Sequence, residues 1–138
     1  MSVEVSTDAS RLDVERIHRW LSEDAYWSLG RTLEVVVRSI AHSLNFGAFD
    51  EHGEQVGYAR VVTDHTTFAW LCDVYVEPSS RGAGVGTALI ERVAAELAPY
   101  RLKRVLLATA DAHDLYRGFG FEPLDHPSRF MVREAPER

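Results

Sequence analysis

A glycine-rich loop between an expected strand and an expected helix is the part of this chain whose residue types most clearly allow chemistry. It reads Arg81-Gly82-Ala83-Gly84-Val85-Gly86 and follows a strand that stops before Pro78. Its three glycines let the backbone approach a ligand closely, because they carry no Cβ. The first amides of the following helix lack intrahelical acceptors and lie at the positive end of the helix dipole. The loop therefore predicts a site for a diphosphate.

The spacing of this loop excludes two common phosphate-binding patterns. A P-loop ends in Gly-Lys-Ser or Gly-Lys-Thr, and no lysine stands here. A dinucleotide-binding fingerprint has the order Gly-x-Gly-x-x-Gly, with an acidic residue about 20 positions further on. The three glycines at positions 82, 84 and 86 do not fit that order. A tight connection without a ligand remains an alternative for this segment alone.

A second segment downstream strengthens the ligand-binding interpretation. It reads Thr109-Ala110-Asp111-Ala112-His113-Asp114-Leu115-Tyr116-Arg117-Gly118-Phe119-Gly120-Phe121. The glycine loop resembles the coenzyme A signature of the GNAT acyltransferase superfamily, and the second segment resembles its closing motif of Ala, then Leu-Tyr, then Gly-Phe. The resemblance runs from about Val3 to Arg133. More narrowly, the chain resembles a bacterial subgroup of small, single-domain GNAT proteins, a likeness that names no acceptor. The segments that carry it are Tyr26-Trp27, Asn45-Phe46-Gly47, Tyr58–Asp64 and Ala108–His113.

The resemblance implies an N-acetyltransferase that moves an acetyl group from acetyl-CoA to a primary amine by direct attack, without a metal. The acceptor would be a small amine, an exposed lysine or a protein N-terminus. The oxyanion would be stabilised by main-chain amides at Val74, Tyr75 and Val76. Thr109 stands where many relatives carry an asparagine that bonds the pantetheine. The positions that match the pyrophosphate-binding residues are Arg81, Gly82, Gly84, Val85, Gly86 and Thr87.

Tyr116 matches the general-acid position of the superfamily. A phenol with a pKa of about 10 is protonated at neutral pH and can donate to the departing thiolate, although a lone tyrosine is also a common core residue. The attacking amine must lose a proton, since an alkylammonium has a pKa of about 10.4. Asp73 and His113 are the candidate bases, with Asp64, His65 or a water relay as alternatives.

The least regular segment, from Ser22 to Gly30, is the expected acceptor side. Tyr26 and Trp27, with Glu23 and Asp24, could form an aromatic and acidic wall around a cationic amine. The alternative is a loop whose aromatic rings only cover the edge of the core. A non-catalytic coenzyme A-binding regulatory module is the second function class, and Tyr116 favours the enzyme.

Hydrophobic periodicity predicts an α/β (α+β) domain that covers residues 1–138. We expect a GNAT fold with a mixed, mostly antiparallel sheet flanked by helices. Asp8, Ser10 or Asp13 would cap the first helix. Strand, helix and strand in succession normally form a right-handed parallel crossover. The resemblance implies that the two parallel strands splay to admit the pantetheine arm. The expected strands are Val3–Ser6, Asn45–Phe49, Gln55–Val62, Thr67–Val76 and Arg104–Thr109, and the expected helices are Val14–Leu21, Thr32–Ser43 and Gly84–Leu97.

The composition and charge of the chain argue against several binding partners and structural groups. The chain has 138 residues, 46% of them hydrophobic, and 15 basic against 21 acidic residues give a net charge of −6. Nucleic-acid binding is therefore not expected. Cys72 is the only cysteine, so neither a disulfide nor a zinc site is expected.

No apolar run approaches the roughly 20 residues of a membrane span, and the N-terminus does not resemble a signal peptide. A cytoplasmic location without membrane contact is the expectation. For a homodimer, the candidate surface comprises Trp20, Trp27, Trp70 and an expected strand at Phe130-Met131-Val132.

Overall fold

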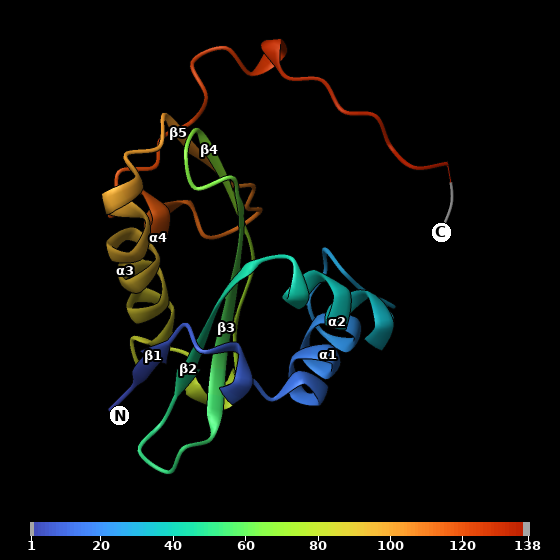
Figure 1. Ribbon diagram of the computed structural model, residues 1–138, viewed down its shortest axis with the longest axis vertical. Helices are drawn as coiled ribbons and strands as arrows, with labels where there is room; N and C mark the ends of the chain where they lie inside the picture. The colour runs from blue at the N-terminus through green and yellow to red at the C-terminus, as the bar shows by residue number, and fades with distance from the viewer. Residues whose placement is uncertain (1, 137–138) are drawn as a thin grey trace.

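The computed structural model, which describes residues 2–136, is built on a five-stranded sheet with strand order β1-β2-β3-β4-β5 (Figure 1). The first four strands pair antiparallel, and β4 pairs with β5 in parallel. The prediction of a mixed, mostly antiparallel sheet is therefore confirmed. The strands are β1 (Glu4–Ser6), β2 (Leu44–Phe49), β3 (Gln55–Thr63), β4 (Phe68–Val76) and β5 (Arg104–Leu106).

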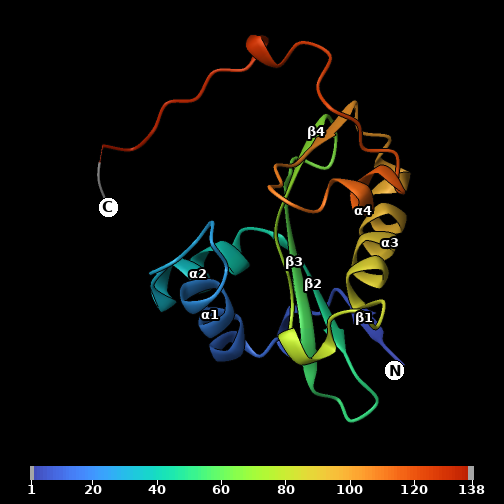
Figure 2. The same ribbon diagram turned by 180° about the vertical axis from the view of Figure 1, so that it is seen from behind.

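Helices cover the sheet on both faces (Figures 1 and 2). On one face lie α1 (Val14–Glu23) and α2 (Leu33–Ala41), and on the other α3 (Val85–Leu97) and α4 (His113–Arg117). Of the three expected caps, Asp13 begins α1, where its carboxylate accepts the Arg16 amide at 3.1 Å. None of the helices within residues 2–136 is long and apolar enough to cross a membrane.

Each face of the sheet has its own apolar core. Trp20 of α1 stacks on Tyr75 of β4 with ring centroids 5.3 Å apart, and the rest of that core comes from α1, α2 and β3. On the other face, α3 packs Val85, Leu89 and Ile90 against the strands, each with at most 1% of its surface exposed. Full burial of such a side chain stabilises the fold by about 1.5–3 kcal/mol. Both helical layers are thus held firmly on the sheet.

A β-bulge in β4 determines which way its side chains point. Tyr58 of β3 pairs with Tyr75, whereas Arg60 pairs with Cys72, so β4 contains one residue more than β3 over this stretch. Asp73, at the bulge, has a left-handed φ of 52°. The extra residue shifts by one position the alternation of side chains between the two faces of the sheet. Leu71 and Val74 consequently pack on the α3 side, although they are three residues apart.

Two sequence-based expectations about the C-terminal third are corrected. β5 was expected to reach Thr109 but ends at Leu106, because its pairing with β4 stops at the Trp70–Leu106 pair and the strands then part. The segment Phe130-Met131-Val132 was expected as a strand, but it is irregular because no strand lies beside it. Residues 122–124 still line the space beside α3 and β5, and the chain beyond them extends from the body as an arm (Figures 1 and 2).

Candidate active site

The glycine loop forms an open cradle at the start of α3. Gly82 and Gly84 have φ angles of 82° and 86°, in the left-handed region that disfavours other residues. A Cβ at either position would meet no atom within 4 Å, so the loop faces open space. No side chain caps α3, which leaves its first amides, those of Val85, Gly86 and Thr87, without a side-chain acceptor. This arrangement suits an anion such as a pyrophosphate.

Arg81 lies at the edge of this cradle and is held by three contacts. Its Nε donates to the Val76 carbonyl at 3.0 Å, a terminal nitrogen pairs with Asp24 at 3.3 Å, and the guanidinium lies 5.2 Å from the centre of the Tyr75 ring. The Tyr75 hydroxyl also donates to Asp24. Burial, together with this hydrogen bond to Asp24, raises the pKa of Tyr75 to about 12. The side chain of Arg81 is 53% exposed and can still reach an anion.

The three expected oxyanion positions follow the bulge. The side chains of Val74 and Val76 pack into the core under α3, and that of Tyr75 packs against α1. Only their main chain is therefore available to a ligand. Since a bulge interrupts the regular ladder of strand hydrogen bonds, it is a place where main-chain groups can turn towards a ligand.

Tyr116 points from α4 into the core beside Phe121, with ring centroids 5.9 Å apart. The residue is only 8% exposed, and within residues 2–136 its hydroxyl has no hydrogen-bond partner. Burial, followed by the nearby Asp111 carboxylate and Tyr26, raises the pKa of Tyr116 to about 12. The phenol therefore remains protonated well above neutral pH.

The two aromatic residues expected on the acceptor side are anchored rather than free. The Tyr26 hydroxyl accepts the Ala110 amide at 3.0 Å, and the Trp27 indole donates to Asp73 at 2.9 Å. The two rings meet edge to face at 5.0 Å. Tyr26 is 56% exposed and Trp27 41%, so both still present ring surface to a ligand. Tyr26 and Trp27 therefore join the loop that leads into α4 and Tyr116 to the carboxylate of Asp73 in β4.

Asp73 lies at the centre of a buried ion cluster and is 4% exposed. Arg31 and Arg60 both donate to its Oδ2, at 2.8 Å and 2.9 Å. Burial pushes the pKa of Asp73 up, but Arg60 and Arg31 outweigh burial and hold that pKa below its usual value. Asp73 is therefore ionised, fully bonded and a poor proton acceptor.

The remaining candidate residues are divided between the site and its surroundings. His113 begins α4 and lines the same pocket as Tyr116. The Thr109 hydroxyl accepts the Ala112 amide at 3.0 Å and so stabilises the turn before α4, leaving its proton free to donate. Asp64 and His65 lie in the turn before β4, at the opposite end of that strand from the glycine loop, and the structure does not bring them to Tyr116.

The acidic wall expected beside the aromatic pair does not form as a free surface. Asp24 is engaged by Tyr75 and Arg81, and Glu23 ends α1 at the surface. Arg31 and Arg60, which sequence reasoning did not single out, contribute the charges nearest Asp73. Asp73 lies 42 residues from Arg31 and 13 residues from Arg60 in the sequence, so no local sequence pattern reveals these contacts.

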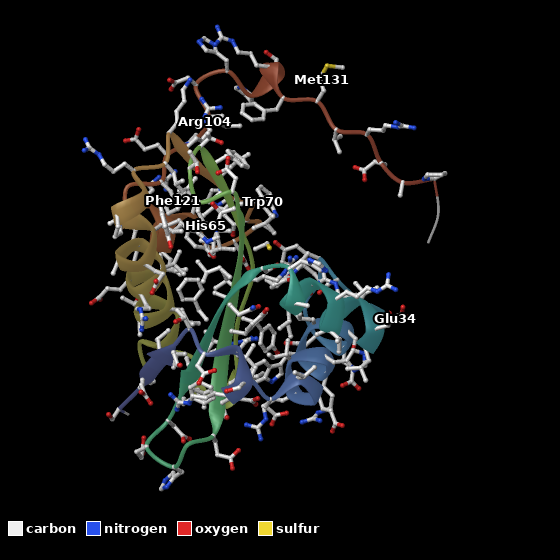
Figure 3. All side chains as sticks on the ribbon, in the orientation of Figure 1. Glu34, His65, Trp70, Arg104, Phe121 and Met131 are labelled. Atoms are coloured by element: carbon white, nitrogen blue, oxygen red, sulfur yellow. The ribbon has the colours of Figure 1, made fainter. Side chains whose placement is uncertain are left out.

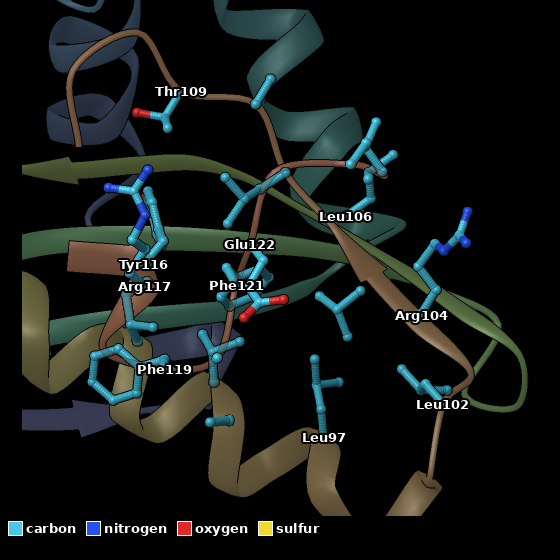
Figure 4. Close-up of a pocket in the computed structure, with 18 of the residues that line it drawn as sticks. Leu97, Leu102, Arg104, Leu106, Thr109, Tyr116, Arg117, Phe119, Phe121 and Glu122 are labelled. Carbon is cyan, nitrogen blue, oxygen red and sulfur yellow. The ribbon is translucent and has the colours of Figure 1, made fainter. Parts of the chain in front are cut away.

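A pocket of about 900 Å³ lies between α3, β5 and α4 (Figure 4). Tyr116, His113 and Thr109 line one end of it, but the glycine loop does not line it. The remaining lining is mostly apolar and comes from the second half of α3, from β5 and from residues 119–127. In the part of the chain that the structure describes, no group of three or more His, Cys, Asp or Glu side chains could hold a metal ion.

Comparisons with known proteins agree on one family. The model of the Acetyltransferase (GNAT) family matches residues 14–121. A crystal structure from Xanthomonas campestris pv. campestris, described as a GNAT-family "putative acetyltransferase", has a TM-score of 0.93 and 47% identity, covering 99% of this chain and 95% of that one. "Putative acetyltransferase FG08082" of Gibberella zeae is 31% identical over 131 residues, or 81% of this chain and 74% of that protein. A Mycobacterium tuberculosis protein in complex with CoA shares the fold, with a TM-score of 0.72 and 22% identity over 88% of this chain and 73% of that one.

Proposed function

Since the chain belongs to the GNAT acetyltransferase family, we propose that it transfers the acetyl group of acetyl-CoA to a primary amine. The acceptor would be a small amine, an exposed lysine or a protein N-terminus. The observation that carries this proposal is the parting of β4 and β5 after the Trp70–Leu106 pair, with the glycine cradle following β4 and Tyr116 following β5. A thioester bound along the cradle would have its reactive end between these two elements.

The residues of the cradle fit the co-substrate that the family uses. The amides of Val85, Gly86 and Thr87, with Arg81, would hold the pyrophosphate, and the open space beside Gly82 and Gly84 leaves room for it. Thr109 has one hydroxyl proton left to donate to the pantetheine. Acetyl-CoA supplies an acetyl group activated as a thioester.

The amine must reach the thioester in its neutral form, because an ammonium has no lone pair to attack with. Asp73 is held ionised by two arginines, so we assign it a positioning role, fixing Trp27 and Arg31 on the acceptor side. His113, which shares the pocket with Tyr116, is the base that we propose, directly or through a water molecule.

Tyr116 would donate a hydrogen bond to the departing sulfur. Its pKa is raised to about 12. A thiol has a pKa of about 8.5, so complete transfer of the phenolic proton to a free thiolate would be uphill by about 5 kcal/mol. Tyr116 therefore stabilises the developing thiolate by a hydrogen bond and completes the transfer only as a proton arrives from the acceptor nitrogen. Over the whole reaction a C–N bond forms, the C–S bond breaks, and the proton lost by nitrogen ends on sulfur.

The test is thiol release from acetyl-CoA with a panel of small amines and peptides, beside a calorimetric titration with CoA. Tyr116→Phe should lower kcat by about 10²-fold or more while leaving CoA affinity unchanged. Tyr100→Phe, at an exposed position beyond the C-terminal end of α3, is the matched control. CoA binding without turnover on any acceptor would instead indicate a non-catalytic coenzyme A-binding module.

A further inference from the structure

The ion cluster around Asp73 carries more positive than negative charge. The Asp73 carboxylate accepts hydrogen bonds from the guanidinium groups of Arg31 and Arg60, at 2.8 Å and 2.9 Å. In the described part of the chain, neither arginine forms a salt bridge with a second carboxylate. The thiol of Cys72, whose pKa is raised by burial to about 11, is neutral and adds no negative charge. Two guanidinium groups against one carboxylate leave the cluster with a net positive charge.

Arg31 has donors left for a ligand. A guanidinium group carries five N–H donors, and within residues 2–136 the side chain of Arg31 makes a single hydrogen bond, from Nη1 to Asp73. No buried side-chain nitrogen in this range lacks a partner, so Nε and Nη2 of Arg31 are open to solvent. Arg60 has fewer donors left, because its Nη1 also donates to the Ser43 hydroxyl at 3.0 Å. Arg31 is therefore the arginine through which the excess charge reaches a ligand.

Arg31 is held beside the stretch of β4 that no longer pairs with β5. Its guanidinium contacts Asp73, the residue of the β4 bulge that directly precedes the expected oxyanion position Val74. Its main chain is fixed as well, since the Arg31 amide donates to the Ser28 carbonyl at 3.0 Å and the Arg31 carbonyl lies 3.1 Å from Nε2 of His18. A group fixed in this way loses little conformational freedom when a ligand binds.

Two aromatic rings extend from Arg31 towards the loop before α4. Trp27 donates to the other oxygen of Asp73, so Trp27 and Arg31 bind the same carboxylate. Tyr26 packs edge to face on Trp27 and accepts the Ala110 amide in the loop that leads into α4. Both rings are partly exposed. The uncharged part of an acceptor bound at Arg31 would therefore lie along these rings on its way to the thioester.

We propose that the acceptor is an amine that also carries an anionic group, a carboxylate or a phosphate, and that Arg31 binds this group. This inference rests on the proposed acetyl transfer. Guanidinium groups bind such anions through short, charge-assisted hydrogen bonds. An acceptor whose only charge is an ammonium would instead approach a cluster of its own sign. The acidic residues of the loop do not offset that charge, because Asp24 is engaged by Tyr75 and Arg81.

The test uses ω-amino acids from β-alanine to ε-aminocaproate, each beside the n-alkylamine of equal length. The two members of a pair differ in the anionic group but hardly in the pKa of the amine. Aminoethylphosphonate, compared with β-alanine, separates a preference for phosphate from one for carboxylate. For the best pair, kcat/KM of the anionic member should exceed that of the alkylamine by at least about tenfold. Equal values of kcat/KM for both members of every pair would overturn the proposal.

Arg31→Gln removes the charge and should cancel this preference by raising KM for the anionic acceptors about tenfold. Arg31→Lys keeps the charge and should retain part of the preference. A loss of stability alone would lower turnover of both members of a pair equally, so the ratio of their kcat/KM values separates binding from folding. A preference that survives Arg31→Gln would contradict the proposal.

Arg38→Gln is the matched control, because it removes the same charge elsewhere. Arg38 pairs with Glu34 on the exposed surface of α2. Figure 3 shows Glu34 on the outer side of that helix, away from Trp70 of β4. This variant should keep the preference of the wild type.

Calorimetry makes the test independent of turnover. The CoA-saturated protein is titrated with the N-acetylated ω-amino acids and with the matching N-alkylacetamides. The acids should bind the wild type at least about tenfold more tightly, and Arg31→Gln should remove that difference. Turnover without any preference for the acids would overturn the anion site and leave the proposed acetyl transfer standing. Selective binding of the acids without turnover on any acceptor would support the anion site and contradict the proposed transfer.

Discussion

The Tyr26 hydroxyl accepts a hydrogen bond from the Ala110 amide at 3.0 Å, across 84 residues of sequence. This bond joins the loop after α1 to the loop that leads into α4 and Tyr116. The adjacent Trp27 indole donates to Asp73 at 2.9 Å. The acceptor side and the residue proposed as the acid are thus connected through two neighbouring aromatic side chains.

Tyr26→Phe should show how much this connection contributes. The change removes one hydrogen bond and keeps the ring, so the free energy of unfolding should fall by about 0.5–1.5 kcal/mol. Because the loop that carries Ala110 leads into α4, kcat should fall as well. Urea unfolding and steady-state kinetics measure both effects. Unchanged kinetics would mean that the loop is held without Tyr26.

The glycine cradle can be tested with a pair of matched substitutions. Gly82 and Gly53 have φ angles of 82° and 79°, and a Cβ at either would meet nothing within 4 Å. Alanine at each should destabilise the fold by about 1–2 kcal/mol, because both positions are left-handed. Only Gly82→Ala should weaken CoA binding, by about tenfold, since Gly53 lies in the β2–β3 turn. Calorimetric titration decides this, and equal affinities would exclude the loop as the pyrophosphate site.

Asp73→Asn should destabilise the protein strongly. It leaves Arg31 and Arg60 without their shared carboxylate, and breaking a buried pair of this kind costs about 3–5 kcal/mol. The lowered pKa of Asp73 contributes stability above its unfolded value of 3.8, and this contribution is lost as the pH falls through the folded value. The wild type should therefore lose more stability below about pH 4 than the variant does.

Urea unfolding between neutral and acidic pH measures this difference. Glu34→Gln is the control, because Glu34 pairs with Arg38 on the exposed surface of α2 and such pairs contribute at most about 1 kcal/mol. An Asn variant as stable as the wild type would contradict the assignment of Asp73 to the ion cluster.

Alkaline pH should destabilise the protein through its buried thiol and phenol. Burial raises the pKa of Cys72 to about 11, and burial with Asp111 raises that of Tyr116 to about 12. These groups ionise first in the unfolded chain, so their effect begins at about pH 8.5, where an unfolded cysteine ionises, and grows as the pH rises towards the folded values. Cys72→Ala should remove the earlier part of the decline in urea midpoint, and Tyr116→Phe should reduce the later part, to which Tyr75 and Tyr58 also contribute because burial raises their pKa values too. An unchanged decline in both variants would refute this origin.

The parts of the fold that could be predicted from sequence are those with a local cause. The glycine loop and the start of α3 depend on consecutive residues, and Asp13 begins α1 through an amide only three residues ahead. The cluster around Asp73 could not be foreseen, because it joins residues from the loop after α1, from β3 and from β4. The early end of β5 has a non-local cause as well, since it depends on where β4 ceases to run beside it.

The strand expected at residues 130–132 shows the same limit. Its run of three apolar residues suits a strand, but a strand needs an edge to pair with, and within residues 2–136 no strand lies beside it. The aromatic pair Tyr26 and Trp27 was expected on the acceptor side, but its anchoring to Ala110 and Asp73 is visible only in three dimensions.

The bulge in β4 makes this strand sensitive to the number of its residues as well as to their kind. Asp73 is the one residue between Cys72 and Val74, and removing it would restore simple alternation with Leu71 and Val74 still facing the α3 layer and Tyr75 the α1 layer. A single-codon deletion at the bulge should therefore keep the inner and outer faces of the strand and lose only the residue that carries the buried carboxylate. A single-codon deletion in the regularly alternating part of β4 before Cys72 has no such tolerance, because it would exchange the two faces of the residues on one side of it.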